Sequence, residues 1–342
     1  MATITPVDCH VAGQVVRLVT GGMPRALGKG PVERAAWFKR HADRLRRALV
    51  LEPRGHADMM AVALTEASPP AHAGLLFMDG GGYPRFVPGA AVAAATLCIE
   101  RQLIVTGEPD GPEQTLVFDT AIGAVRARAR VERTGPDGAG AGQPRVTSVA
   151  LDLGPAFVHT ASSQVKRGPR RVPFDVAFGG DFFAIVDSEA AGVPLGRAHI
   201  EDLRRVGLEL CAVVDAQVVL SHPRLGGPQP LAGVVLTGQP SSDAAHLRGV
   251  VVSRHGVVDR SSLSGSAAVM AVLDAMGIVA EGQPFVHEGT SGLTVQGTLV
   301  RRTTLGDLSA VDLEVTATAW VTGEHVWHLH DDDPLRYGDE HE

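Results

Sequence analysis

The residues best suited to chemistry lie together in Asp259–Leu273, which reads DRSSLSGSAAVMAVL. A carboxylate is followed by hydroxyl side chains and a glycine, and then by helix-forming apolar residues. Hydroxyl side chains favour helix N-termini, and such a start offers unpaired N–H groups and the positive end of a dipole to a carboxylate. The stretch predicts either an anion-binding helix start or an ordinary capped core helix. The residues concerned are Asp259, Ser261, Ser262, Ser264, Gly265 and Ser266.

A second helix start of the same kind lies about half a chain earlier. Phe86–Leu97 reads FVPGAAVAAATL and aligns without a gap to the later helix, with Val87 opposite Leu263. Pro88 suits the first helical turn, where its missing N–H is no loss. This internal repeat predicts two similar domains whose central helices contribute to one site.

Other polar clusters are better explained by structure than by metal binding or catalysis. Histidines beside carboxylates lack the spacing of a zinc hydrolase motif, and polar residues that fix turns explain them more simply. A histidine-rich segment near the C-terminus is interpreted as a polar surface tail. We therefore expect no metal site; the residues considered are Asp8, His10, His56, Asp58, His325, His328 and His330.

Neither a bound cofactor nor a nucleophile motif is indicated. Gly80–Gly82 and Gly179–Gly180 lack the G-x-G-x-x-G context of a dinucleotide site, so no cofactor is expected. Ser262 and Ser264 could act as nucleophiles only beside a base. Because the chain contains no G-x-S-x-G elbow, helix capping is their preferred role.

Composition describes an ordinary soluble protein. The 342 residues carry a formal net charge of −7, with 44% hydrophobic residues and no basic run interleaved with aromatic ones. Nucleic-acid binding is therefore not expected, and no apolar run approaches the ~20 residues of a membrane span. The three cysteines form neither an even set nor a C-x-x-C pair. Without a secretory signal, a cytoplasmic location is expected.

The remaining elements indicate two domains rich in strands. Helical spacing predicts one helix over Pro31–Val50, with Arg44, Arg46 and Arg47 on its solvated face. Short strands dominate elsewhere, including one at Leu103–Thr106, and Glu132–Pro144 is expected to be a loop. Because strands outnumber helices and hairpin-length gaps are common, we expect an α+β fold with mostly antiparallel sheets around central helices.

Ordered motifs along nearly the whole chain resemble those of the proline racemase family, which includes hydroxyproline epimerases and trans-3-hydroxyproline dehydratases. The resemblance implies a two-domain fold of the diaminopimelate epimerase type with the site in the interdomain cleft. It implies one domain formed by residues 1–172 with 319–342 and another by 173–318, and a homodimer. The motifs are VDCHVAGQVVRLV from Val7, PRGHADMM from Pro53, FMDGGGY from Phe77, GGDFFAIVD from Gly179, VVDRSS from Val257, FVHEGTSG from Phe285, AWVTG from Ala319 and DDPL from Asp332.

At the two helix starts this chain departs from the family. Family members normally read M-C-G-H and D-R-S-P-C-G-T-G-T there, and the two cysteines form a thiol/thiolate pair on opposite faces of the substrate α carbon. Here both cysteine positions are apolar, Val87 and Leu263, and the first motif's histidine is Gly89. Removal of an α proton needs a group that ionises near working pH, so two-thiol racemisation is not expected.

The resemblance leaves the binding half of the site in place. It implies that Asp259 meets the substrate nitrogen, as an anchor or as the preferred acid/base group, with Ser262 and Ser264 as weaker catalytic candidates. It also implies that backbone N–H groups of two residue pairs bind the substrate carboxylate, and that two apolar side chains line the site. The pairs are Gly89 with Ala90 and Gly265 with Ser266, and the apolar residues are Val87 and Leu263.

These considerations favour an enzyme that performs cofactor-independent isomerase- or lyase-type chemistry on a proline-like or other small carboxylate. One alternative is a catalytically silent homologue that binds an amino acid or a protein partner. A residual hydroxyproline epimerase is the third hypothesis. If the site holds a small zwitterion, Asp259→Ala is expected to abolish binding while leaving the fold intact.

Overall fold

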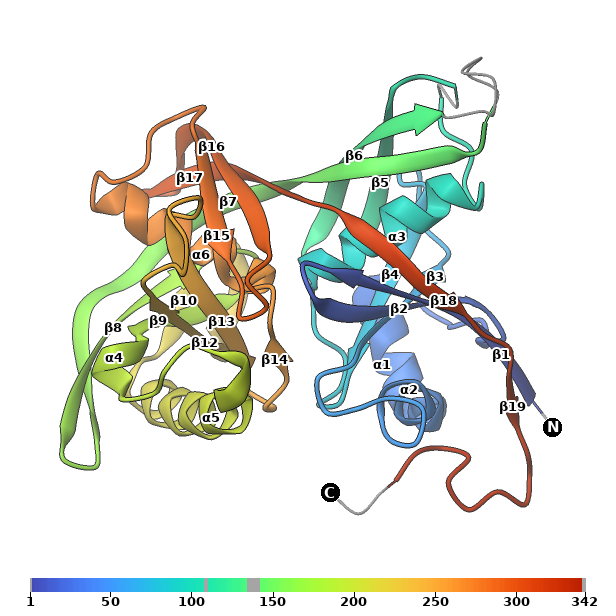
Figure 1. Ribbon diagram of the computed structural model, residues 1–342, viewed down its shortest axis with the longest axis horizontal. Coiled ribbons are helices and arrows are strands. Elements are labelled where there is room, and N and C mark those ends of the chain that lie inside the picture. Colours follow the sequence, from blue (N-terminus) through green and yellow to red (C-terminus); the bar gives the residue numbers. More distant parts are fainter. Residues whose placement is uncertain (1, 108–109, 134–141, 340–342) are drawn as a thin grey trace. The chain divides into compact units, whose positions relative to one another are not determined.

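The computed structural model describes residues 2–107, 110–133 and 142–339 (Figure 1). The chain divides into two compact units, unit 1 with Met1–Leu151 and Thr316–Glu342, and unit 2 with Asp152–Val315. The limits of the units fall inside two strands, β7 (Pro144–Arg167) and β17 (Leu308–Ala317). The resemblance placed the domain limits at 172 and 318 instead.

Unit 1 is a mostly antiparallel sheet with one helix, α3, at its centre. The chain of pairings runs β18–β1–β2–β3–β4–β5–β6–β7, and only β2–β3 and β4–β5 are parallel. β19 extends this arrangement by pairing with β1. The elements are β1 (Ala2–Val11), β2 (Gln14–Gly21), α1 (Pro31–His41), α2 (Asp43–Val50), β3 (Met60–Thr65), β4 (Ala73–Asp79), α3 (Pro88–Glu100), β5 (Glu113–Thr120), β6 (Gly123–Arg133), β18 (Ala319–Glu324) and β19 (Trp327–Leu329).

The composition of α3 explains its central position. Its sequence PGAAVAAATLCIE is apolar on all sides, and every residue from Pro88 to Ile99 is buried. A helix of this kind must be enclosed rather than laid on a surface. It contacts β1, β2, β3, β6 and β18, so the sheet curves around it.

Unit 2 repeats this plan around α6. The pairings run β7–β8–β9–β12–β13–β15–β16, with β9–β12 and β13–β15 parallel, and β14 adds to β13. α6 contacts β8, β9, β13 and β16. The elements are β8 (Arg170–Phe178), β9 (Phe182–Asp187), α4 (Ser188–Ala191), η1 (Arg197–His199), α5 (Ile200–Gln217), β10 (Leu220–His222), β11 (Leu225–Gln229), β12 (Gly233–Gly238), β13 (Leu247–Ser253), β14 (Val258–Asp259), α6 (Leu263–Ala275), β15 (Pro284–Glu288) and β16 (Thr294–Leu305).

The two units share one order of connections. Each unit begins with an antiparallel strand pair, β1–β2 or β8–β9, which is followed by surface helices. The next strand, β3 or β12, lies parallel to the second strand of that pair and is followed by its own antiparallel partner, β4 or β13. The central helix and a hairpin, β5–β6 or β15–β16, come next. α3 and α6 are both 13 residues long. The internal repeat read from the helix starts therefore extends to the fold.

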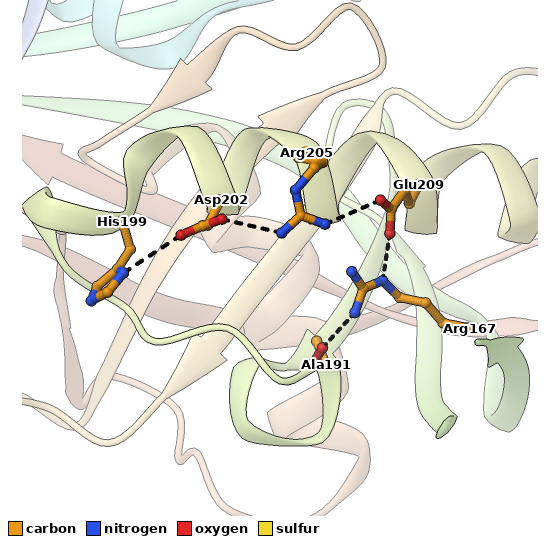
Figure 2. A network of polar contacts seen from close by, with 6 residues as sticks. All are labelled: Arg167, Ala191, His199, Asp202, Arg205 and Glu209. Carbon is orange, nitrogen blue, oxygen red and sulfur yellow. Dashed lines mark hydrogen bonds and ion pairs between the residues drawn. The ribbon is translucent and has the colours of Figure 1, made fainter. Parts of the chain in front are cut away.

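The outer face of α5 carries a ladder of ion pairs (Figure 2). Arg205 bonds Asp202 at 3.1 Å and Glu209 at 3.2 Å, and Glu209 also accepts from Arg167 of β7 at 2.7 Å. Arg167 Nη1 donates to the carbonyl of Ala191 at 3.0 Å. Exposed pairs of this kind contribute little to stability, because water and salt screen them. These contacts connect β7 and α4 to α5 on a solvated surface.

Three expectations about local structure need correction. The helix expected over Pro31–Val50 is two helices, because Ala42 leaves the helical region at φ −139°. Arg46 is buried rather than solvated, and its guanidinium donates to Asp43 and to the carbonyl of Asp79. The strand expected at Leu103–Thr106 is irregular chain after α3, and the expected loop at Glu132–Pro144 lies largely outside the described residues.

Candidate functional site

Asp259 stands at the end of β14, immediately before α6, and its carboxylate is fully engaged by its own loop. One oxygen accepts from Ser261 N at 3.0 Å and Ser261 Oγ at 2.5 Å. The other accepts from Ser264 N at 3.1 Å and Ser264 Oγ at 2.6 Å. A carboxylate offers about four acceptor sites, and the side chain is 4% exposed. This geometry makes Asp259 the N-terminal anchor of α6.

Ser262 is the residue before α6 and has a left-handed backbone, with φ 59°. Its side chain makes no cap, and its Oγ has no hydrogen-bond partner among the described residues. The hydroxyl lies over Gly249 of β13, where an added Cβ would come within 2.8 Å of it. The residue is completely buried, so it presents no accessible nucleophile.

The conformation of Ser262 separates this loop from the usual D-R-S-P-C sequence of the resembled family. Proline holds φ near about −65°, which is incompatible with the φ of 59° at Ser262. The loop that begins α6 therefore follows a different backbone path from one built on proline at this position.

Ser266 and His287 form a buried hydrogen-bonded pair that the sequence analysis missed. Ser266 Oγ lies 3.0 Å from His287 Nδ1 and donates to the carbonyl of Ser262 at 3.0 Å. His287, on β15, is 1% exposed, and its Nε2 has no partner among the described residues. Burial, with a smaller contribution from His246, lowers the pKa of His287 to about 4, so the ring is neutral at pH 7.

This pair locks α6 to β15. A serine beside a histidine is the arrangement that activates a nucleophile, but Ser266 is only 2% exposed. The signal that could have identified the pair is the histidine within the apolar-flanked segment FVHEG, where a buried position demands a polar partner.

Some backbone N–H groups at the start of α6 already have acceptors in the preceding loop, and one has none within the helix. Ser261 Oγ accepts from Leu263 N at 3.2 Å, and Asp259 accepts from Ser264 N. Helix geometry leaves the next N–H, that of Gly265, without an intrahelical partner, and Ser266 N–H is the first that can bond back to Ser262. Gly265 is required here, because a Cβ would lie 2.5 Å from Val235 Cγ2.

The start of α3 has a simpler construction. Val87 is the N-cap residue, Pro88 is the first helical residue, and no side chain caps the helix. Ala91 N donates to Val87 O at 3.0 Å, so helix geometry leaves the N–H groups of Gly89 and Ala90 without intrahelical partners. Packing does not demand glycine at residue 89, since a Cβ would meet only Val11 at 3.9 Å.

Neither helix start contains an ionisable thiol. Val87 and Leu263 are 6% and 1% exposed. Cys9, Cys98 and Cys211 are all buried, and burial raises their pKa values to about 12, about 12 and about 11. All three thiols are therefore protonated at neutral pH, and none can serve as a thiolate base.

The polar clusters considered for metal binding take part in other contacts. Arg17 forms an ion pair with Asp8 at 2.7 Å, and His325 lies 3.3 Å from the same carboxylate. His56 Nδ1 accepts from the backbone of Asp58, as a turn requires. Within the part of the chain that the structure describes, no group of three or more His, Cys, Asp or Glu is arranged to hold a metal ion. No described helix is long and apolar enough to cross a membrane.

Comparison with known proteins gives one consistent result. A family model described as proline racemase matches residues 6–339. A proline racemase of Clostridioides difficile is 31% identical, and a trans-3-hydroxy-L-proline dehydratase of Azospirillum brasilense is 33% identical, each over 98% of this chain and 97% of the relative. A crystal structure of a hydroxyproline epimerase from Agrobacterium vitis, with bound trans-4-OH-L-proline, has a TM-score of 0.85 at 26% identity and covers 99% of this chain and 94% of its own.

Proposed function

Because the chain belongs to the proline racemase family, we propose that it is a cofactor-independent isomerase- or lyase-type enzyme acting on a proline-like or other small carboxylate without a two-thiol acid/base pair. The observation that carries the proposal is the pair of apolar residues, Val87 and Leu263, that begin α3 and α6. Neither can exchange a proton, whereas the backbone donors beside them are retained.

The relatives support the class of substrate. They include a proline racemase, a trans-3-hydroxy-L-proline dehydratase and a 3-hydroxyproline 2-epimerase, so the names span isomerases and a lyase on cyclic imino acids. What these names have in common is a small ring that bears a carboxylate. We propose that the substrate of this protein shares this feature. We propose that its reaction uses acid and base groups other than a pair of thiols.

Carboxylate binding is assigned to the unpaired backbone N–H groups of the helix starts. Gly89 and Ala90 at α3 and Gly265 at α6 present donors at the positive end of an apolar helix. We propose that Ser266 acts differently from its neighbour, with its side chain positioning the helix through His287. Val87 and Leu263 favour a ligand with a less polar body.

Asp259 is proposed to position the start of α6 rather than to transfer a proton. Its four hydrogen bonds come from Ser261 and Ser264, which occupy the acceptor sites that a substrate ammonium would need. Ser264 is thereby also committed to the loop. The base that this proposal requires is a group outside the two helix starts, or the substrate itself.

The second hypothesis is a catalytically silent homologue that binds an amino acid or a protein partner. The engaged carboxylate of Asp259 and the buried, protonated cysteines favour it. Residual hydroxyproline epimerase activity ranks third because the thiol positions are apolar. A homodimer and a cytoplasmic location belong to the same proposal and rest on the resemblance alone.

The test is incubation with L-proline, trans-4-hydroxy-L-proline and trans-3-hydroxy-L-proline in deuterated water, followed by proton NMR. We expect no α-deuterium and no D-epimer from these three compounds. In a wider set of small carboxylates, we expect one compound to be converted to a product. Iodoacetamide should leave that turnover unchanged, because all three cysteines are buried. Steady α-exchange at an enzymatic rate would refute the loss of two-thiol chemistry, and saturable binding without any product would support the silent homologue.

A further inference from the structure

Unit 1 contains a cavity of about 410 Å³ that the helix starts do not explain. It is bordered by a loop after β2, the buried face of α1 and the end of β3. Its lining combines apolar side chains with two arginines. The lining residues are Met23, Pro24, Arg25, Ala26, Arg34, Phe38, Ala63, Leu64, Thr65 and Glu66.

Arg34 lines this cavity from the buried side of α1. It precedes Phe38 by four residues, so the two side chains share one helix face, and Arg34 is only 6% exposed. Its Nη1 donates to the backbone carbonyl of Glu66. Gly74 of β4 leaves room for this contact, since a Cβ there would lie 2.7 Å from that carbonyl oxygen and 3.5 Å from Arg34 Nη1. The guanidinium is therefore held in a fixed place by the backbone.

Unlike the other buried arginines of unit 1, Arg34 has no carboxylate partner among the described residues. Arg17 pairs with Asp8 at 2.7 Å and Arg46 pairs with Asp43 at 2.8 Å. Buried charges in proteins are nearly always paired, because an uncompensated one is costly.

The cavity itself supplies no counter-ion for Arg34. Glu66 is the single carboxylate among the lining residues, and it pairs at 2.9 Å with Arg25. That pair is exposed, with Glu66 at 58%. Arg25 and Glu66 cancel one another, so Arg34 leaves one positive charge facing the cavity.

We propose that this cavity binds a small monocarboxylate with an apolar body. A guanidinium presents two parallel donors that match the two oxygens of a carboxylate, and Met23, Phe38 and Leu64 provide apolar side chains in the lining. The volume falls within the range of small-molecule sites. The site lies in unit 1 and does not depend on the proposed activity at α3 and α6.

The test titrates 3-phenylpropionate into the full-length protein by calorimetry, with neutral 3-phenylpropanamide as the comparison. We expect one saturable site for the carboxylate and at least about a tenfold weaker interaction for the amide, because the charge-assisted bonds are lost. Arg34→Gln should weaken 3-phenylpropionate binding by a similar factor. Lys39→Gln removes the same charge from an exposed position on the same helix and should bind as the wild type does.

A second variant keeps the test independent of the folding of Arg34→Gln. Leu64→Trp fills the cavity without altering the guanidinium, and it should abolish binding of 3-phenylpropionate. The proposal is overturned if the wild type shows no saturation at millimolar concentration, or if the amide binds as well as the acid. It is also overturned if Arg34→Gln, folded, binds like the wild type, since the carboxylate then occupies another place such as a helix start.

Discussion

Replacing Asp259 with alanine should destabilise unit 2 substantially, in contrast to the expectation from sequence that the fold would be unaffected. The change removes four hydrogen bonds to a buried carboxylate. The hydroxyls of Ser261 and Ser264 can rotate to other partners, whereas their two backbone N–H groups cannot. At about 1.5–3 kcal/mol for each bond to a charged acceptor, loss of the two N–H bonds alone sets a lower limit of about 3 kcal/mol.

The measurement is hydrogen exchange by mass spectrometry on peptides from α6 and α3. A loss of about 3 kcal/mol corresponds to roughly a hundredfold faster exchange in α6, with α3 as the internal reference. Asp243→Ala, an exposed carboxylate in the same unit, is the matched control and should stay within about 0.5 kcal/mol of wild type. If Asp259→Ala exchanges like Asp243→Ala, the anchoring role is wrong.

Further substitutions and a pH titration test the two helix starts and their surroundings. Ser262→Pro should cost about 3 kcal/mol in urea unfolding because of its φ of 59°, while Ser262→Gly should be neutral or stabilising by about 1 kcal/mol. The free energy of unfolding should fall by about 3 kcal/mol as the pH drops from 6.5 towards 4, because His287 takes up a proton at a higher pH in the unfolded chain than in the folded one. His287→Gln should flatten the dependence of stability on pH. An unchanged dependence would contradict the lowered pKa of His287. Gly265→Ala should cost about 1–3 kcal/mol through its contact with β12, whereas thermal melts should show Gly89→Ala to be tolerated.

The sequence was sufficient for the fold because its signals were redundant. The apolar stretches behind Pro88 and Leu263 predicted both central helices, and the alternating strands predicted the sheets. The break at Ala42 could not be read, because alanine and its neighbours favour a helix and only tertiary packing ends it there. Leu103 and Val105 have apolar side chains but remain exposed, and they pair with no strand in the described part of the chain.

The residues of the candidate site remain a prediction from the sequence, and several of their contacts could not be predicted from it. Sequence placed serines at the start of α6 as caps, but the side chain of Ser262 makes no cap. Ser261 Oγ accepts the N–H of Leu263, and Asp259 accepts the N–H of Ser264. The pairing of Ser266 with His287 joins residues 21 positions apart and depends on the register of β15 against α6. The segment FVHEG indicates that His287 needs a polar partner, but only the packed fold decides which residue that is.

The left-handed turn at Ser262 also bears on whether two-thiol chemistry could be introduced into this chain. Restoring the thiols by Val87→Cys with Leu263→Cys is expected to recover little racemase activity, because the new cysteine at residue 263 would stand on a loop whose path excludes the family's usual proline. Proline at residue 262 is harmful while Ser264 and Asp259 hold the present loop. Proline at residue 262 therefore requires that the hydrogen bonds between Ser264 and Asp259 change with it, so this loop must be altered as a unit.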